Sequence, residues 1–264
     1  NFPLDGQPSP VESISNVGDQ CYYNSIIADT DGSLHISWLQ TISGSNHVFY
    51  MHRDSTGNWS SVEDVSLTNS GSSQPHLASN DNGKAYLVWN DKENNEDILF
   101  FSERDEISGW SLPINISTGL TARKTFFIVV DPFEGVHILW RESDNSKFYE
   151  DSIYAAYRPN IGTWTSPVQI AAPDGSKGIP AIDIDDTGII HVAWANTLAY
   201  PNDIYYSSRS LNGAWANPIQ ISTSVASRDV RITASKNGKL FIMWESEGFY
   251  YSTKSESGTW EAVQ

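Results

Sequence analysis

Nine side chains of chemically active types stand at recurring places in this sequence. They are three carboxylates, three guanidinium groups, two phenols and one imidazole, namely Asp91, Glu142, Glu245, Arg123, Arg141, Arg228, Tyr22, Tyr23 and His76. A guanidinium group holds a carboxylate or sulfate by paired hydrogen bonds, a tyrosine ring stacks on a pyranose ring, and a carboxylate pair acts as acid and base or as nucleophile. We therefore expect a saccharide site in which the three carboxylates are the catalytic candidates and the other six residues bind the ligand.

A structural interpretation of the same residues stays open. Arginine and glutamate at strand ends also form ion pairs that fill a narrow channel, and such pairs perturb pKa values as catalytic sites do. His76 can equally be a buried histidine that is hydrogen-bonded to a loop carbonyl. No motif in the sequence decides which carboxylate would act as the acid.

Tryptophan reveals the elements that must position these residues. Five tryptophans are spaced by 51, 51, 54 and 50 residues, and each ends an apolar segment: Trp38, Trp89, Trp140, Trp194 and Trp244. A second set follows the first by 16 to 24 residues: Trp59, Trp110, Trp164, Trp215 and Trp260. Five copies of one unit account for all ten tryptophans, and we expect both sets to be packing elements.

Each unit has the pattern of four short β-strands. In the fourth copy these are residues 181–184, the segment that ends at Trp194, residues 203–207 and residues 215–222. β-Branched and aromatic residues fill the strands, and Gly, Asn, Asp and Pro fill the gaps. The sequence therefore predicts an all-β protein, and five units of about 51 residues favour a five-bladed β-propeller of four-stranded antiparallel blades. One β-sandwich, or two in tandem, is the competing architecture.

The repeat also predicts the domain organisation. We expect a single propeller domain over residues 1–264, with repeats at about 17–67, 68–118, 119–171, 172–222 and 223–264. Residues 8–16 match a fourth strand and are expected to close the fifth blade, although residues 259–264 also begin such a strand. Either the two segments share the fifth blade or the chain was cut from a longer one.

A propeller brings the candidate residues to one face. Loops that join the fourth strand of a blade to the next blade, and the second strand to the third, surround the mouth of the central channel. The nine candidate residues fall in or beside these loops. Because the two residues that follow each tryptophan of the first set differ among the five units, we expect one asymmetric site rather than five equal ones.

The turns between the third and fourth strands carry a family resemblance. Each contains Gly and ends in Trp, and together they span residues 54–59, 107–110, 160–164, 211–215 and 257–260. They resemble degenerate Asp-boxes, the Ser-x-Asp-x-Gly-x-x-Trp hairpins of the sialidase superfamily of β-propellers. The resemblance implies a propeller whose hairpins lie on the face away from the active site. The box Asp is mostly missing and the Arg-Ile-Pro segment of sialidases is absent, so no sialidase catalytic residue is transferred. The five-blade count instead resembles furanosidase-type glycosidases and certain five-bladed lectins.

Metal and cofactor sites are not expected. His35, His137 and His191 share one strand position, at which Tyr86 and Phe241 stand in the other copies, so packing with a hydrogen bond explains them better than metal binding. Acidic turns such as residues 185–188 lack the glutamate that completes a calcium loop, and we expect them to be hairpin turns.

Charge and composition exclude several classes of partner. The chain has 16 Lys and Arg against 32 Asp and Glu, and a net charge of −16 repels nucleic acids and anionic lipids. Its longest apolar run, residues 126–130, is too short to insert into a membrane. The single cysteine, Cys21, excludes an intramolecular disulfide and a thiolate zinc site. Residues 1–5 have no signal-peptide pattern, so we expect any export signal to be absent from this chain.

Three functions stay open after these exclusions. The first is a secreted or cell-surface protein that binds a saccharide or glycoconjugate at one asymmetric site, without a cofactor. The second is an exo-acting glycoside hydrolase or polysaccharide lyase that uses the carboxylates at the channel mouth. The third is a structural or protein-interaction propeller, which predicts a partner with a basic patch.

Overall fold

The computed structural model is that of an all-β protein. It describes residues 13–15, 20–67, 71–80, 82–93, 96–117, 122–143, 151–171, 177–196, 203–211, 213–222, 228–235, 238–255 and 258–264. These ranges contain twenty strands and no helix, which confirms the predicted fold class at the level of all-β. None of the described segments forms a helix able to cross a membrane.

The strands form five antiparallel sheets, which we number in chain order. Sheet 1 contains β1 (Cys21–Ala28), β2 (Leu34–Ile42), β3 (Ser45–Arg53) and β4 (Glu63–Asp64). Sheet 2 contains β5 (Ser73–Ser79), β6 (Ala85–Glu93), β7 (Glu96–Asp105), β8 (Gly109–Trp110) and β9 (Ile114–Asn115). Sheet 3 contains β10 (Ala122–Val130), β11 (Val136–Ser143), β12 (Asp151–Arg158) and β13 (Val168–Ala171). Sheet 4 contains β14 (Ala181–Ile184), β15 (Ile190–Asn196), β16 (Asp203–Arg209) and β17 (Ile219–Gln220). Sheet 5 contains β18 (Arg228–Ala234), β19 (Leu240–Glu245) and β20 (Phe249–Lys254).

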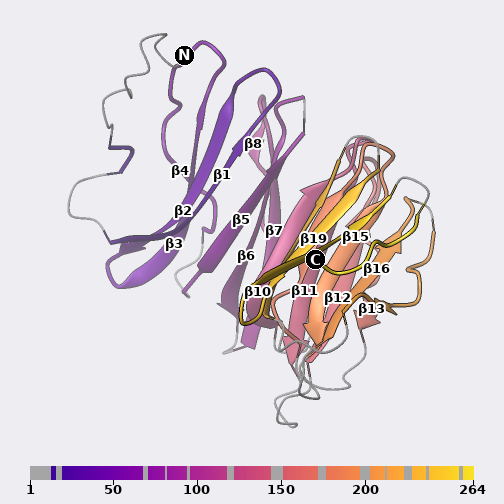
Figure 1. Cartoon of the computed structure of the whole chain (residues 1–264). Helices are drawn as coiled ribbons and strands as arrows, with labels where there is room; N and C mark the ends of the chain where they lie inside the picture. The colour runs from indigo at the N-terminus through magenta and orange to yellow at the C-terminus, as the bar shows by residue number, and fades with distance from the viewer. Residues whose placement is uncertain are drawn as a thin grey trace.

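The sheets follow one another in space as they do in sequence. Figure 1 shows sheets 1 to 4 in succession from indigo to orange, with the yellow sheet 5 overlapping sheets 3 and 4 in this view. Their first strands are neighbours, β1 beside β5, β5 beside β10, β10 beside β14 and β14 beside β18. Repeated four-stranded sheets packed around their first strands are the arrangement of a β-propeller. In the described residues sheets 1, 3 and 4 have the predicted four strands, whereas sheet 2 has five and sheet 5 has three.

The first set of tryptophans lies in the core, as predicted. These five side chains are at most 4% exposed. Each stacks on an aromatic ring of the third strand in its own sheet, with ring centroids 5.9 to 6.4 Å apart: Trp38 on Phe49, Trp89 on Phe100, Trp140 on Tyr154, Trp194 on Tyr205 and Trp244 on Tyr250. The repeated residue therefore performs the same packing role in every sheet.

The second set of tryptophans joins neighbouring sheets. Trp110 of sheet 2 meets the edge of Tyr50 in sheet 1, with ring centroids 4.9 Å apart. Trp164 of sheet 3 meets Phe101 of sheet 2 in the same way, also at 4.9 Å. Edge-to-face pairs of this kind stabilise a contact beyond the apolar area that they bury. These half-buried rings define a seam between each sheet and the next.

A ladder of cations, which the sequence interpretation overlooked, completes the seams. A basic residue stands at the end of every third strand, last in four of them and last but one in β7: Arg53, Arg104, Arg158, Arg209 and Lys254. Four of the five lie 5.0 to 5.5 Å from a ring of the preceding sheet, namely Arg104 over Tyr50, Arg158 over Phe101, Arg209 over Tyr157 and Lys254 over Tyr206. Each of these four seams thus combines an aromatic ring with a cation from the following sheet.

The three aligned histidines are structural, which confirms the predicted packing with a hydrogen bond. Each is 3% exposed and donates from Nε2 to an aspartate in the turn before its strand: His35 to Asp29 at 2.9 Å, His137 to Asp131 at 2.8 Å and His191 to Asp185 at 3.2 Å. Because the carboxylate accepts the Nε2 proton, Nδ1 is free to accept the Tyr50 and Tyr206 hydroxyl protons in sheets 1 and 4.

We expect these buried histidines to make the protein sensitive to acid. Burial lowers the pKa of His137 and of His191 below the value of about 6.5 for an unfolded histidine. As the pH falls from about 7.5 to about 5, the unfolded chain binds protons that the folded chain does not, so the free energy of unfolding falls. Thermal unfolding at the two pH values measures the effect.

The double variant His137→Phe/His191→Phe is the matched control, because Phe241 occupies the equivalent place in sheet 5. The variant should lose part of the pH dependence. A pH dependence as steep as that of the unsubstituted protein would refute this explanation.

The cation ladder yields a second stability prediction. The Arg158 guanidinium donates to Glu103 at 3.0 and 2.6 Å and lies over Phe101, so Arg158→Ala removes a paired ion contact and a cation–π contact between sheets. We expect a loss of about 2 kcal/mol in the free energy of unfolding, measured by denaturant titration. Arg53, whose Nε donates to the Gly57 carbonyl in its own hairpin, is the control, and Arg53→Ala should cost less than half as much. Equal losses would contradict a special role for the seam.

Candidate functional site

A central cavity of about 570 Å³ lies where the first strands of the sheets meet. Every sheet contributes to its described wall, through Tyr23, Asn24, Ser25, Gln74, Pro75, His76, Thr125, Phe126, Phe127, Ile179, Pro180, Ala181, Ile182, Arg231 and Ile232. The volume lies within the range of roughly 300–1,000 Å³ that is typical of small-ligand sites. Sheets 1, 2, 3 and 5 supply polar groups or aromatic rings and sheet 4 supplies aliphatic residues, so we take this cavity as the candidate site.

The first strands are irregular where they border the cavity. The pairing register shifts in β1 between Tyr22 and Ser25, in β5 between Ser73 and His76, in β10 between Ala122 and Phe126, and in β18 between Arg228 and Arg231. Bulges of this kind bend a strand and redirect its side chains, and they are common beside functional sites. A bulge in the first strand therefore shapes the cavity wall in four of the five sheets.

Backbone strain gathers at the same rim. Tyr23, Gln74 and Asp229 have φ angles of 48°, 48° and 41°, a region that costs free energy for residues other than glycine. Each of the three stands 15 residues before the tryptophan of its second strand. This spacing is a sequence signal for the cavity rim, because four of the five residues at this place, Tyr23, Gln74, Thr125 and Ile179, line the cavity.

His76 is the most constrained polar group in the cavity wall. Its ring packs edge-on against Phe126 and Phe127, at 5.3 Å from each ring centre. Burial lowers the pKa of His76, so its imidazole is neutral at physiological pH. In the part of the chain that the structure describes, the imidazole nitrogens have no hydrogen-bond partner, so they are available to a ligand. The predicted ligand-binding position of His76 is thus compatible with the geometry.

Arg231 is the one charged residue in the described wall. Its Nη1 donates to the Val230 carbonyl at 2.9 Å, and no carboxylate in the described ranges pairs with it. The described wall contains no Asp or Glu. Arg231 is therefore a positive charge without a carboxylate partner in the described wall of a protein whose net charge is −16. The sequence interpretation missed Arg231, although it follows the strained Asp229 by two residues.

Of the two predicted tyrosines, Tyr23 lines the cavity and Tyr22 lies beside it. Tyr23 is 57% exposed and Tyr22 is 47% exposed. The Tyr22 hydroxyl donates to the Gln20 side chain at 2.9 Å. Both rings are accessible to a ligand that enters from the rim of β1.

The three predicted carboxylates are not brought together in the cavity wall. Asp91 is 1% exposed and accepts hydrogen bonds from the Ser72 hydroxyl at 2.8 Å and from the Lys92 amide at 2.7 Å. Glu142 is 2% exposed in β11, and Glu245 is exposed at the end of β19. The contacts of Asp91 hold the segment before β5, so its position fits the structural interpretation, while the catalytic role of all three stays a prediction.

The predicted Arg141 belongs to a buried polar cluster at the ends of sheets 3 and 4. Its Nη1 donates to the Lys177 carbonyl at 2.6 Å. The Lys177 amide donates to Asp151 at 3.3 Å, and the Lys177 ammonium donates to Asn196 at 3.5 Å. These contacts fasten the segment before β14 to β11, β12 and β15. The side chains of the remaining predicted residues, Arg123 and Arg228, lie outside the described residues.

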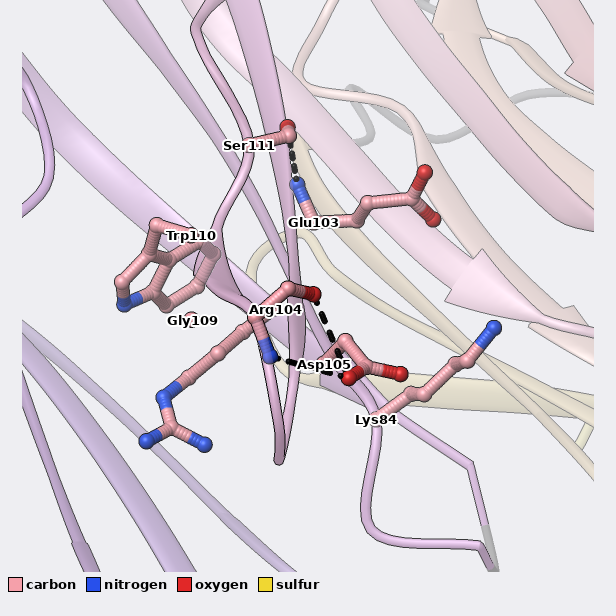
Figure 2. A pocket seen from close by; sticks show the side chains of 8 residues that line it. Lys84, Glu103, Arg104, Asp105, Gly109, Trp110 and Ser111 are labelled. Carbon is pink, nitrogen blue, oxygen red and sulfur yellow. Dashed lines mark hydrogen bonds between the residues drawn. The ribbon is translucent and has the colours of Figure 1, made fainter.

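A second hollow, of about 360 Å³, does not focus its side chains on a ligand. It lies at the edge of sheet 2. Figure 2 shows Arg104 and Trp110 extending to one side of the strands and Glu103 and Lys84 to the other. Accordingly, Arg104 lies over Tyr50 of sheet 1, whereas Glu103 binds Arg158 of sheet 3. These side chains form seams between sheets.

Comparison with known proteins supports the fold. Neither the protein-family models nor the curated proteins match the sequence. A protein of unknown function from Dyadobacter fermentans matches with a TM-score of 0.63 and 10% identity, over 92% of this chain and 81% of that one. The Hadza microbial sialidase Hz136 matches with a TM-score of 0.57 and 9% identity. The match covers 92% of this chain but only 58% of the sialidase chain. A Penicillium chrysogenum α-L-arabinanase complexed with arabinobiose matches with a TM-score of 0.55 and 11% identity. The match covers 92% of this chain and 93% of the arabinanase chain.

These matches place the chain among glycosidase-like β-propellers by fold. At identities of 9 to 11% they show the fold alone. The predicted likeness to sialidase-type propellers is confirmed at that level, while the Asp-box resemblance stays a prediction.

The strained rim can be tested without a ligand. Gln74→Gly removes the steric cost of a left-handed backbone, so we expect the free energy of unfolding to rise by roughly 0.5–1 kcal/mol. Ser73→Gly, one residue earlier in the same strand, is the control and should lower it, because glycine there only loses conformational freedom. Denaturant titration measures the free energy of unfolding of both variants. A lower value for Gln74→Gly than for the unsubstituted protein would contradict strain at this position.

Proposed function

We propose that this protein is a five-bladed β-propeller that binds a saccharide at one asymmetric site in its central cavity, without cleaving it. The observation that carries the proposal is the described cavity wall, to which every sheet contributes and to which sheets 1, 2, 3 and 5 contribute unlike polar or aromatic groups. A single site built from unlike residues suits one ligand in one orientation. The glycosidase-like fold supports a saccharide as the class of ligand.

The wall offers complementary groups for a sugar. The accessible Tyr23 ring can stack on the apolar face of a pyranose. The neutral His76 imidazole offers one donor and one acceptor, and Asn24, Gln74 and Thr125 add uncharged donors and acceptors. The Arg231 guanidinium, with no carboxylate beside it in the described wall, favours a sugar that carries a carboxylate or sulfate.

Hydrolysis or lysis by Asp91, Glu142 and Glu245 is the alternative. A glycosidase needs two carboxyl groups on either side of the scissile bond. The absence of Asp and Glu from the described wall supports binding over hydrolysis. A partner protein with a basic patch is the remaining alternative, supported by the net charge of −16. For a saccharide ligand we also propose a secreted or cell-surface location, where glycoconjugates are met.

An array of immobilised glycans tests the proposal against both alternatives. Each spot is examined for retained protein and, by mass spectrometry, for a change in the glycan. We expect retention on a subset of glycans with no change in mass. Loss of one sugar would establish an enzyme and direct attention to the three carboxylates, and a blank array would contradict a saccharide function.

Substitutions then assign the site. Against a retained glycan, Arg231→Ala and His76→Ala should each weaken binding by about tenfold or more, because each removes a polar contact in a partly desolvated site. Lys84→Ala removes a positive charge at the hollow of Figure 2 and serves as the control, with unchanged affinity expected. Titration calorimetry measures the affinity of all three variants for the glycan. Equal weakening by Lys84→Ala would indicate a nonspecific charge effect.

A further inference from the structure

The wall of the central cavity has a polar side and an apolar side. Sheets 1 and 2 supply the polar side through Tyr23, Asn24, Ser25, Gln74 and His76. The apolar side comes from sheets 3, 4 and 5, whose first strands are neighbours, through Phe127, Ile179, Ile182 and Ile232. Sheet 4 contributes no polar side chain to the described wall. Ile179 is 39% exposed there, and an open aliphatic side chain in a hollow is typical of a surface that a ligand covers.

Sheet 4 forms its part of the wall without a bulge. Within the described residues β14 pairs with β15 in one register, whereas the first strands of the other four sheets are bulged. The residues before β14 reach back along β15 instead. Lys177 forms a bridge with Asn196, and the Gly178 amide donates to the Ala195 carbonyl at 2.8 Å. A side chain at Gly178 would bring its Cβ to 3.1 Å from that of Ala195, so this close approach favours glycine. The contact places the next residue, Ile179, in the cavity wall.

Two charged side chains of sheet 3 hold the backbone of Lys177. The Arg141 Nη1 donates to the Lys177 carbonyl at 2.6 Å, and the Lys177 amide donates to Asp151 at 3.3 Å. Hydrogen bonds to charged groups are stronger than those between neutral groups, and Lys177 and Asp151 are each only 2% exposed to water. We call this arrangement the Lys177 clasp. It fixes, from sheet 3, the backbone two residues before Ile179.

We propose that Arg141 is a positioning residue for the cavity, and that the segment held by the Lys177 clasp presents Ile179 as the centre of an apolar subsite for a methyl-bearing group of the saccharide. This inference rests on the proposed function. Tyr23 already offers a surface for the apolar face of a sugar ring, so a second apolar surface suits a substituent. A hydroxyl group placed against the side chains of sheet 4 would lose its hydrogen bonds to water without replacement. The methyl carbon of an acetyl or O-methyl group has no such bonds to lose.

The apolar side adjoins the positive charge of the wall. Arg231 directly precedes Ile232 in β18, and both residues line the cavity. A sugar whose acidic group binds the Arg231 guanidinium thus brings a neighbouring substituent to the apolar side. The class of ligand is therefore an acidic saccharide that carries an acetyl or O-methyl group.

Paired probes on the glycan array test the subsite. One pair is N-acetylglucosamine 6-sulfate and glucose 6-sulfate, and the other is 4-O-methylglucuronic acid and glucuronic acid. We expect the methyl-bearing member of at least one pair to bind about tenfold more tightly than its partner, as one small apolar group does in a fitted pocket. Retention of glycans on the array without this preference in either pair would overturn the subsite and leave the proposed function standing. A blank array would overturn both.

Substitutions assign the preference to sheet 4. Ile179→Asn places a polar group in the apolar side, so the ratio of the two affinities should fall from about tenfold to below about threefold. Ile161→Asn is the matched control, because Ile161 is 92% exposed on a hairpin of sheet 3 and lies outside the described wall. It should leave the ratio unchanged. The same ratio in Ile179→Asn as in the unsubstituted protein would overturn the subsite.

Arg141→Met tests the positioning role, because it removes the guanidinium of the Lys177 clasp and keeps a long side chain. We expect the same fall in the affinity ratio, and hydrogen exchange about tenfold faster at the Gly178 amide, which bonds to β15. Arg209→Met is the control for stability alone, since Arg209 lies in a seam and donates to its own hairpin. It should change neither readout. A lower Tm for Arg141→Met with both readouts unchanged would overturn the positioning role.

Hydrogen exchange in the unsubstituted protein makes the test independent of the folding of the variants. The Lys177 clasp requires the Gly178 amide to exchange as slowly as the amides of β15. Exchange as fast as that of the exposed hairpin residue Ile161 would overturn the clasp.

Discussion

The contact between one sheet and the next is the interaction on which the rest of this molecule depends. A sheet of three or four short strands is not stable alone, because one of its faces would expose apolar side chains to water. In this protein the next sheet covers that face, and at each contact it encloses an aromatic ring of the third strand. Tyr50 shows it most fully, with Trp110 at its edge, Arg104 over its face and the His35 ring bonded to its hydroxyl.

The repeated seams leave the inner strands free to differ. The stacked tryptophans and the cations recur in every sheet, whereas the residues around the cavity include a tyrosine, a histidine, an arginine and two phenylalanines. Packing therefore constrains the outer parts of each sheet, and the bulged inner ends can be adapted to one ligand. This division explains how a repetitive chain builds a single asymmetric site.

Much of the fold was predictable, because the spacing of a residue as large as tryptophan reports a repeated packing environment. His35, His137 and His191 were also interpreted correctly, since substitution by Phe or Tyr at one repeat position argues for packing. The site was harder. A position just after Trp89 does not reveal that Ser72 will bury Asp91, because burial depends on the path of a loop from another part of the chain. The bulges at Tyr23 and Gln74 depend on backbone geometry, although their shared distance from the tryptophan was a usable signal.

The most direct test of the central claim, one asymmetric saccharide site in a repetitive fold, is the stoichiometry of binding. Native mass spectrometry of the full chain, titrated to saturation with a glycan retained on the array, counts bound ligands on each molecule. The account predicts one ligand per chain at saturation, because the sheets share a single cavity. Several ligands per chain, one for each repeated seam, would contradict it and would move the site from the centre of the molecule to the contacts between its sheets.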